Sequence, residues 1–395
     1  MPPGDGAPKT VSLDVETSGL TGTLALQLND VQELVLSKDG KYSFSAPLPL
    51  NSSYVLRTLK QPLWQRCDLS SYSGSVQEPT RITVRCVTAM AQVSTFAGSD
   101  TQTPGDADGQ GTDAEFFSPY GLAIDAGGQL FVSQQDGQSV LRKVTPGGLV
   151  STLADLATTG DVPNGIAVDR IGNLYAASQQ AHRIFKLSSD LKTAVLAGSG
   201  QRGSADGLGV VASFDEPIGT AIDSSGQIYV TDRMNSLIRR ITPDGVVSTL
   251  KTDAPLFNPK GIAVDDQDTI YVSDRNRILK ITGDGHVMVL AGSTLSGSED
   301  GVGEEATFYE PNSLAVDLDH NVFVTESIGT VRRITPAGKV STVAGVAAVP
   351  GSSNGIGTAA LFDGPTGIAV DPAGAVYVAD RRNHKIRQLI PIWPK

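Results

Sequence analysis

Polar and apolar residues alternate with a period of two through the first part of the chain. Runs such as "TVSLDVET", "GTLALQL", "YSFSA" and "RITVRCV" lie within residues 10–88 and are separated by turn residues such as Lys38-Asp39-Gly40. Strict alternation puts every second side chain on one face of a strand, so these runs predict half-buried antiparallel strands. We therefore predict a small immunoglobulin-like β-sandwich over residues 10–88, after a flexible segment over residues 1–9.

From residue 91 onward the chain repeats. Each of six segments contains strands like "GIAVD", "IYV", "LIRRI" and "VVSTL", and the first of these is the near-continuous apolar strand expected where both faces are enclosed. A spacing of 42 to 54 residues separates the aspartates that end these strands: Asp125, Asp169, Asp223, Asp265, Asp317 and Asp371. This period fits one four-stranded blade per repeat. We therefore predict that residues 91–395 form an all-β, six-bladed propeller.

One outer strand stands out of place. "QVSTFAG", residues 92–98, precedes the first repeat, whereas the sixth repeat ends after its third strand at "KIRQLIP". Residues 92–98 must then complete the sixth blade. This N-to-C strand closure would leave no blade with an open edge.

The repeats resemble a known family. The pieces "GIAVD", "YVADRRNHKIR" and "DGxGxxAxF" closely resemble NHL repeats throughout residues 91–395, which implies the six-bladed fold. Residues 10–88 are similar, in their "DGKYSF" stretch, glycine and two-cysteine pattern, to β-sandwich modules of bacterial secreted and lipid-anchored surface proteins. That second resemblance implies an extracytoplasmic spacer.

The chain has two cysteines, Cys67 and Cys86, both in the first region. Two cysteines in one β-rich unit predict a disulfide and an oxidising compartment, with two buried thiols as the alternative. A metal site on this pair is disfavoured because no histidine precedes His182.

The net charge of −11 belongs to residues 91–395, since residues 1–90 carry as many basic as acidic side chains. An acidic propeller disfavours nucleic acid, whose binding depends on lysine and arginine. No apolar run approaches the roughly 18 residues that span a membrane. We expect a bacterial, extracytoplasmic, monomeric protein, which a lipid anchor ahead of the printed N-terminus could hold to the envelope.

Several acidic and histidine residues are predicted to be structural. Each repeat aspartate precedes a turn residue and should bond to the backbone of its hairpin, as should Asp232, Asp274 and Asp380. The stretch "GDADGQGTD" (105–113) resembles a calcium loop, but Phe117 falls where the bidentate carboxylate belongs, so a turn is predicted, with a weak surface cation as the alternative. The four histidines do not converge and are predicted to lie on the surface: His182, His286, His320 and His384.

Candidate binding residues are those at which the blades differ, because the shared residues are used by turns and packing. The starts of the inner strands and the loops joining second to third strands should share the rim of the channel mouth. The strand starts are Tyr120, Asn164, Ile218, Lys260, Asn312 and Thr366, and the loop residues are Gln135, Gln180, Arg233, Arg275 and Arg381. We predict ligand binding by Tyr120, Asn164, Lys260, Asn312, Thr366, Arg233, Arg275 and Arg381.

This pattern favours an extracytoplasmic binding protein for a protein or glycan ligand, without a cofactor. The alternative is a metal-dependent lyase or lactonase, because six-bladed relatives include such enzymes with a metal at the channel mouth. Its Ca²⁺ or Zn²⁺ would need Glu216, Asn258 and Glu310, which lie shortly before the inner strands of neighbouring blades. No nucleophile is visibly paired with a base. RNA binding, known in some animal NHL proteins, is disfavoured by the acidic charge.

Overall fold

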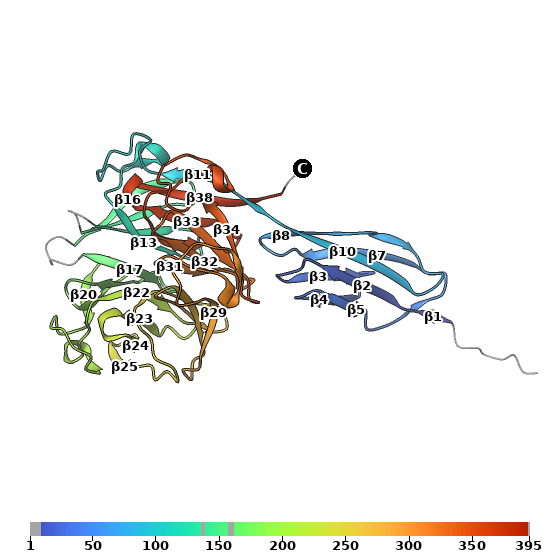
Figure 1. Ribbon diagram of the computed structural model, residues 1–395, viewed down its shortest axis with the longest axis horizontal. Coiled ribbons are helices and arrows are strands. Elements are labelled where there is room, and N and C mark those ends of the chain that lie inside the picture. Colours follow the sequence, from blue (N-terminus) through green and yellow to red (C-terminus); the bar gives the residue numbers. More distant parts are fainter. Residues whose placement is uncertain (1–8, 136–138, 157–161, 394–395) are drawn as a thin grey trace, which may run out of the picture. The chain divides into compact units, whose positions relative to one another are not determined.

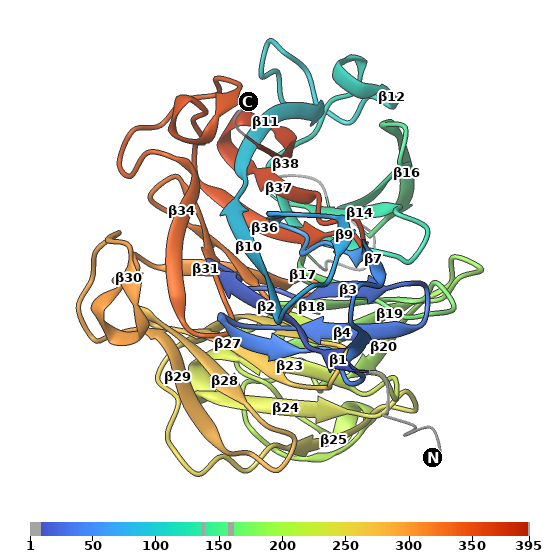
Figure 2. The same ribbon diagram turned by 90° about the vertical axis from the view of Figure 1, so that its right-hand side faces the viewer.

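The computed structural model describes residues 9–135, 139–156 and 162–393. The chain divides into two compact units, Met1–Met90 with Pro391–Lys395, and Ala91–Ile390. The described elements are β-strands and single 3₁₀ turns (Figures 1 and 2). Among these residues no helix is long and apolar enough to cross a membrane.

The first unit contains two four-stranded sheets. One has the order β5 (Gly40–Ser43), β2 (Leu13–Ser18), β10 (Thr80–Thr88) and β8 (Gln65–Leu69). The other has the order β4 (Gln32–Leu36), β3 (Leu24–Leu28), β7 (Ser53–Lys60) and β9 (Ser73–Ser75). A short pair, β1 (Thr10–Val11) and β6 (Leu48–Pro49), completes the unit, and β10 runs parallel to β2 while its other neighbour, β8, is antiparallel.

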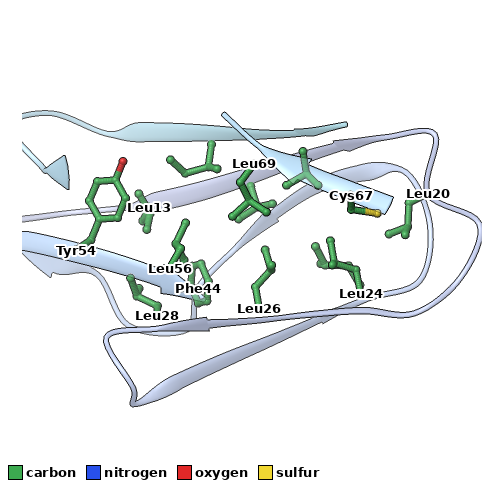
Figure 3. Packing of buried hydrophobic residues seen from close by; sticks show 14 of the residues in the cluster. Leu13, Leu20, Leu24, Leu26, Leu28, Phe44, Tyr54, Leu56, Cys67 and Leu69 are labelled. Carbon is green, nitrogen blue, oxygen red and sulfur yellow. The ribbon is translucent and has the colours of Figure 1, made fainter. Parts of the chain in front are cut away.

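The two sheets of this unit share one hydrophobic core. Leu13 and Leu69 come from the first sheet, and Leu24, Leu26 and Leu56 from the second; all are buried (Figure 3). The alternating burial along β3 and β8 is the predicted period-two pattern.

A disulfide joins Cys67 to Cys86, as predicted. The two cysteines occupy directly opposed positions of the antiparallel strands β8 and β10, with their Cα atoms 3.9 Å apart. The bridge therefore ties neighbouring strands of one sheet.

The second unit contains six sheets, one for each predicted blade. Its innermost strands are β13 (Pro119–Ile124), β17 (Pro163–Val168), β22 (Pro217–Ile222), β26 (Pro259–Val264), β31 (Pro311–Val316) and β36 (Pro365–Val370). The second strands are β14 (Leu130–Gln134), β18 (Leu174–Ser178), β23 (Ile228–Asp232), β27 (Ile270–Asp274), β32 (Val322–Glu326) and β37 (Val376–Asp380). The third strands are β15 (Val140–Val144), β19 (Arg183–Leu187), β24 (Leu237–Ile241), β28 (Arg277–Ile281), β33 (Thr330–Ile334) and β38 (Lys385–Ile392).

The outer strands complete the blades. They are β16 (Leu149–Asp155), β20 (Thr193–Ala197), β25 (Val246–Thr249), β29 (Val287–Gly292), β34 (Lys339–Gly345) and β11 (Met90–Ala97). Four blades carry a fifth, two-residue strand outside these: β12 (Gly109–Gln110), β21 (Gly207–Leu208), β30 (Gly301–Val302) and β35 (Gly355–Ile356). The blades pack directly against one another: Leu122 and Val132 of the first blade, for example, share a buried cluster with Ala369 and Tyr377 of the sixth.

The ring closes where the sequence predicts. In the sixth blade the strand order is β35-β11-β38-β37-β36, so the N-terminal β11 is hydrogen-bonded beside the C-terminal β38 (Figures 1 and 2). Each inner strand contacts the next, and β36 contacts β13. The predicted all-β propeller with N-to-C strand closure is confirmed.

Glycine lets the inner strands approach closely. A β-carbon on Gly165 would lie 2.3 Å from the Ile218 carbonyl oxygen of the next blade. Hydroxyls reinforce the seams, since Ser133 Oγ donates to the Asn164 carbonyl at 2.8 Å and Thr231 Oγ1 to the Lys260 carbonyl at 2.6 Å. The channel between the six strands is consequently narrow.

Candidate functional site at the channel mouth

The predicted strand-start residues all occupy the same place in the fold. Each is the second residue of an inner strand and follows a proline that begins the strand. A cavity of about 50 Å³ lies at this end of the channel. The structure brings five of the six to its lining: Tyr120, Ile218, Lys260, Asn312 and Thr366.

The blades from the second to the fourth are joined at the rim by polar side chains. Asn164 is buried, donates to Gln179 Oε1 at 3.3 Å and accepts from the Gln179 backbone at 3.2 Å. Gln179 in turn donates to Glu216 Oε2 at 2.9 Å, and Arg233 lies 3.3 Å from the same oxygen and donates to Asn258. These contacts hold the side chains in one geometry before any ligand arrives.

Tyr120 connects this network to the last blade. The Arg381 guanidinium lies over the Tyr120 ring, 5.7 Å from its centre. Burial raises the pKa of the Tyr120 phenol, while Arg381 and a hydrogen bond with Asn164 oppose that rise. The phenol therefore stays protonated at neutral pH and offers a hydrogen-bond donor beside a cation.

Lys260 has a different environment. Its ammonium lies 4.0 Å from Glu310 Oε2, and the two side chains are 21% and 61% exposed. Burial lowers the pKa of Lys260, Glu310 raises it, and the nearby Arg233 lowers it. The positive charge of Lys260 at the cavity is therefore only weakly neutralised by Glu310.

Two of the predicted residues serve packing as much as the rim. Asn312 donates to the Pro365 carbonyl at 3.0 Å, and Thr366 Oγ1 donates to the Tyr120 carbonyl at 3.0 Å, so both join adjacent blades. A third, Arg275, is exposed and lies over the Phe257 ring at 4.8 Å.

Gln180 lies in the loop between the second and third strands of the second blade, as predicted, but its neighbour Gln179 makes the rim contacts. Gln179, not Gln180, directly follows the second strand, as Arg233 and Arg381 do in their blades. A count from the last residue of each second strand would have found Gln179. Gln135 also follows its strand, and its backbone donates to the Ser118 carbonyl.

The residues of the alternative metal site have basic partners. Glu216 pairs with Arg233, the Asn258 side-chain oxygen accepts from Arg233 Nε at 2.9 Å, and Glu310 faces Lys260. A metal bound here would have to displace both cations. The donor set therefore does not fit a divalent ion without rearrangement.

The repeat aspartates hold their hairpins, as predicted. Asp265 Oδ1 accepts from the backbone of Gln267 at 3.0 Å and of Thr269 at 2.8 Å, while Oδ2 accepts from the Tyr271 hydroxyl at 3.0 Å. Burial, together with the same pairing to Asp169, raises the pKa of Tyr175 to about 12. These carboxylates are used by the fold.

The loop over residues 105–113 also has a structural role. Asp108 Oδ1 accepts from Arg142 at 2.8 Å and Asp106 accepts from Gln134 at 2.8 Å. Arg142 is fully buried, and equivalent buried arginines occur in other blades: Arg239, Arg332 and Arg387. We did not predict this anchor, although the arginine recurs in "VLRKV", "LIRRI" and "KIRQL".

Two of the histidines are not simple surface residues. His182 Nδ1 accepts from the Glu216 backbone and His384 Nδ1 from the Ser118 backbone, each at 3.1 Å, so each fixes the loop before an inner strand. His286 pairs with Asp253 and is exposed. His320 lies near Asp265 and Asp266, the one group of three potential metal-ligating carboxylate, cysteine or histidine side chains within the described ranges.

Comparison with known proteins identifies the class. A model of the teneurin NHL domain matches residues 88–252, and an NHL-repeat model matches residues 362–389. These segments therefore carry NHL-type repeats, and they lie within a closed ring of six sheets. Mouse Teneurin-3 is 27% identical over an alignment of 344 positions that covers 71% of this chain and 12% of that much longer protein.

Solved structures share the fold. An auxiliary nutrient binding protein from Bacteroides ovatus superposes with a TM-score of 0.62 and 17% identity, over 98% of this chain and 99% of its own. Virginiamycin B lyase from Staphylococcus aureus has a TM-score of 0.52 and 15% identity, over 76% of this chain and all of its own. At these identities the likeness concerns the fold alone.

Proposed function

We propose that the protein is an extracytoplasmic binding protein whose propeller recognises a protein or glycan at the rim of the channel mouth. The rim network from Tyr120 and Asn164 through Glu216 to Arg233 carries this proposal, because it presents fixed polar and aromatic groups around a cavity. Preorganised side chains lose little conformational entropy on binding. Tyrosine and arginine are also frequent interface anchors.

Two further observations support it. The Bacteroides ovatus protein of the same overall fold is named as a nutrient binding protein. The Cys67–Cys86 disulfide favours an oxidising compartment, since such bridges are rare in the cytosol.

The rim can be tested with the full chain against arrays of extracellular proteins and glycans. Once a ligand is found, Tyr120→Ala, Lys260→Ala and Arg275→Ala should each weaken binding by roughly 1–2 kcal/mol with unchanged melting temperature. The matched controls are His320→Ala and Asp244→Ala at the opposite rim. If the controls abolish binding and the three rim variants do not, the proposed face is wrong.

The alternative lyase or lactonase requires a metal held by Glu216, Asn258 and Glu310. Their contacts with Arg233 and Lys260 weigh against it. Metal analysis after dialysis separates the two functions, because the enzyme requires a stoichiometric Ca²⁺ or Zn²⁺ that is lost in Glu216→Gln.

A further inference from the structure

The cavity at the channel mouth contains a single charged side chain. Among the described residues that line it, Lys260 is the one charged group, and the others are glycines, aliphatic residues, Tyr120, Asn312, Ser313 and threonines. A lone ammonium in a mostly uncharged recess attracts an anion more strongly than the same group in open water would.

The Lys260 ammonium is also poorly satisfied. Its charge partner, Glu310, lies at 4.0 Å, beyond hydrogen-bonding distance, and is itself 61% exposed. Within the described residues it donates no hydrogen bond to protein, although an ammonium has three donors. Arg233, which lies close enough to lower the pKa of Lys260, adds to the positive potential.

The size of the cavity limits what can enter. A space of about 50 Å³ exceeds the roughly 10–15 Å³ that one water needs, but it is well below the roughly 150 Å³ of a cavity that admits a benzene ring. A carboxylate group matches that space, whereas a sugar ring or an aromatic ring does not. A larger ligand would therefore insert an end group and lie across the rim.

We propose that the channel mouth binds its ligand through a carboxylate, which enters the cavity and accepts hydrogen bonds from the Lys260 ammonium. This proposal rests on the proposed binding function and names the chemistry that the ligand must carry. A uronic acid and the C-terminal carboxylate of a peptide both supply it. Inorganic phosphate is the competing anion from which the test must distinguish a carboxylate.

The remaining rim explains how such a ligand would be oriented. Tyr120 and Arg381 stack on one side of the mouth, and Arg233 stands on another, held by Glu216 and Asn258. Hydroxyl or amide groups of the ligand could bond to these side chains while the carboxylate occupies the recess.

The test uses the full chain and paired probes. Sodium glucuronate is compared with glucose, and N-acetylglycine with its neutral amide, by calorimetry and by NMR of labelled lysine side chains. We expect saturable binding of a carboxylate probe and none of its neutral counterpart; which pair responds identifies the source. Lys260→Met should weaken binding roughly tenfold or more, as expected for a hydrogen bond to a charged group.

Two variants sharpen the result. Glu310→Gln removes the competing anion and should strengthen carboxylate binding. Lys192→Met, on an 82% exposed lysine of the outer hairpin in the second blade, should leave it unchanged. If Lys260→Met does not fold, two other results still test the proposal. Carboxylate binding should be stronger in Glu310→Gln, and the neutral probes should not bind.

The failures are distinguishable. Equal binding of acid and neutral probes, tighter binding of inorganic phosphate, or no carboxylate binding at millimolar concentration would overturn the carboxylate proposal. If a ligand from the array still depends on Tyr120 and Arg275, the rim proposal stands despite that result. If binding of that ligand depends only on residues of the opposite rim, both the rim proposal and the carboxylate proposal are wrong.

Discussion

A β-carbon on Gly367 would lie 2.3 Å from the carbonyl oxygen of Tyr120, across the seam where the sixth inner strand meets the first. We expect Gly367→Ala to force this seam apart and to lower the free energy of unfolding by about 2–3 kcal/mol, as overpacking typically does. Chemical denaturation of the two proteins measures the difference.

The matched control is Gly283→Ala. Gly283 lies in an outer turn with no heavy atom within 4 Å of the added carbon, and its backbone is not in the left-handed region. Equal losses in the two variants would show that the Gly367 seam is not tightly packed.

Strand closure gives a second prediction. A chain beginning at Thr88 keeps β11 and should unfold cooperatively. A chain beginning at Ser99 lacks β11, exposes the edge of β38, and should melt at a clearly lower temperature or aggregate. Calorimetry and light scattering compare the two; identical melting temperatures would contradict the importance of closure.

Much of this architecture follows from the sequence because the relevant signals are local. The six aspartates, the period-two runs and the misplaced outer strand indicate blades and closure without knowledge of any contact between blades. The aspartate turns were predictable for the same reason: Asp265 bonds to Gln267 and Thr269, which are two and four residues away.

The rim partners were not predictable, because they depend on side chains that meet across blades. Gln179, which bonds to Asn164 within the second blade, donates to Glu216 of the next blade, where Arg233 pairs with the same carboxylate. The proposed metal site could not be judged from the sequence for the same reason. In the sequence Glu216 and Glu310 have no evident partners, whereas in the fold neighbouring loops bring Arg233 and Lys260 to them.

The disulfide gives a third prediction. It joins cysteines separated by 19 residues, and a bridge closing such a loop stabilises by about 3 kcal/mol. Replacing both Cys67 and Cys86 with serine should destabilise the first unit by this order and leave the unfolding of the second unchanged. Intact mass before and after reduction and alkylation checks the bridge; two freely alkylated thiols in oxidised, folded protein would contradict it.

The last prediction concerns Asp380, a fully buried carboxylate of the sixth blade. It accepts hydrogen bonds at 2.8 Å from the Asp363 backbone, Asn383 and Arg387. Burial raises the pKa of Asp380 to about 6, although Arg387 opposes the rise. The folded chain then binds a proton more tightly than the unfolded chain, in which the group titrates near its ordinary value of 3.8.

Between about pH 4 and pH 6 the folded state therefore holds more protons, so this residue makes the free energy of unfolding fall as the pH rises. The full effect is at most on the order of 3 kcal/mol. Denaturation at a series of pH values should therefore show the stability of Asp380→Asn, relative to the natural protein, rising with pH across this window. The amide oxygen introduced by this substitution can still accept the Asp363 N–H, and Arg387 keeps the carbonyls of Leu361 and Ser353, so the variant should fold. Parallel pH profiles in the two proteins would show that Asp380 does not take up its proton in this range.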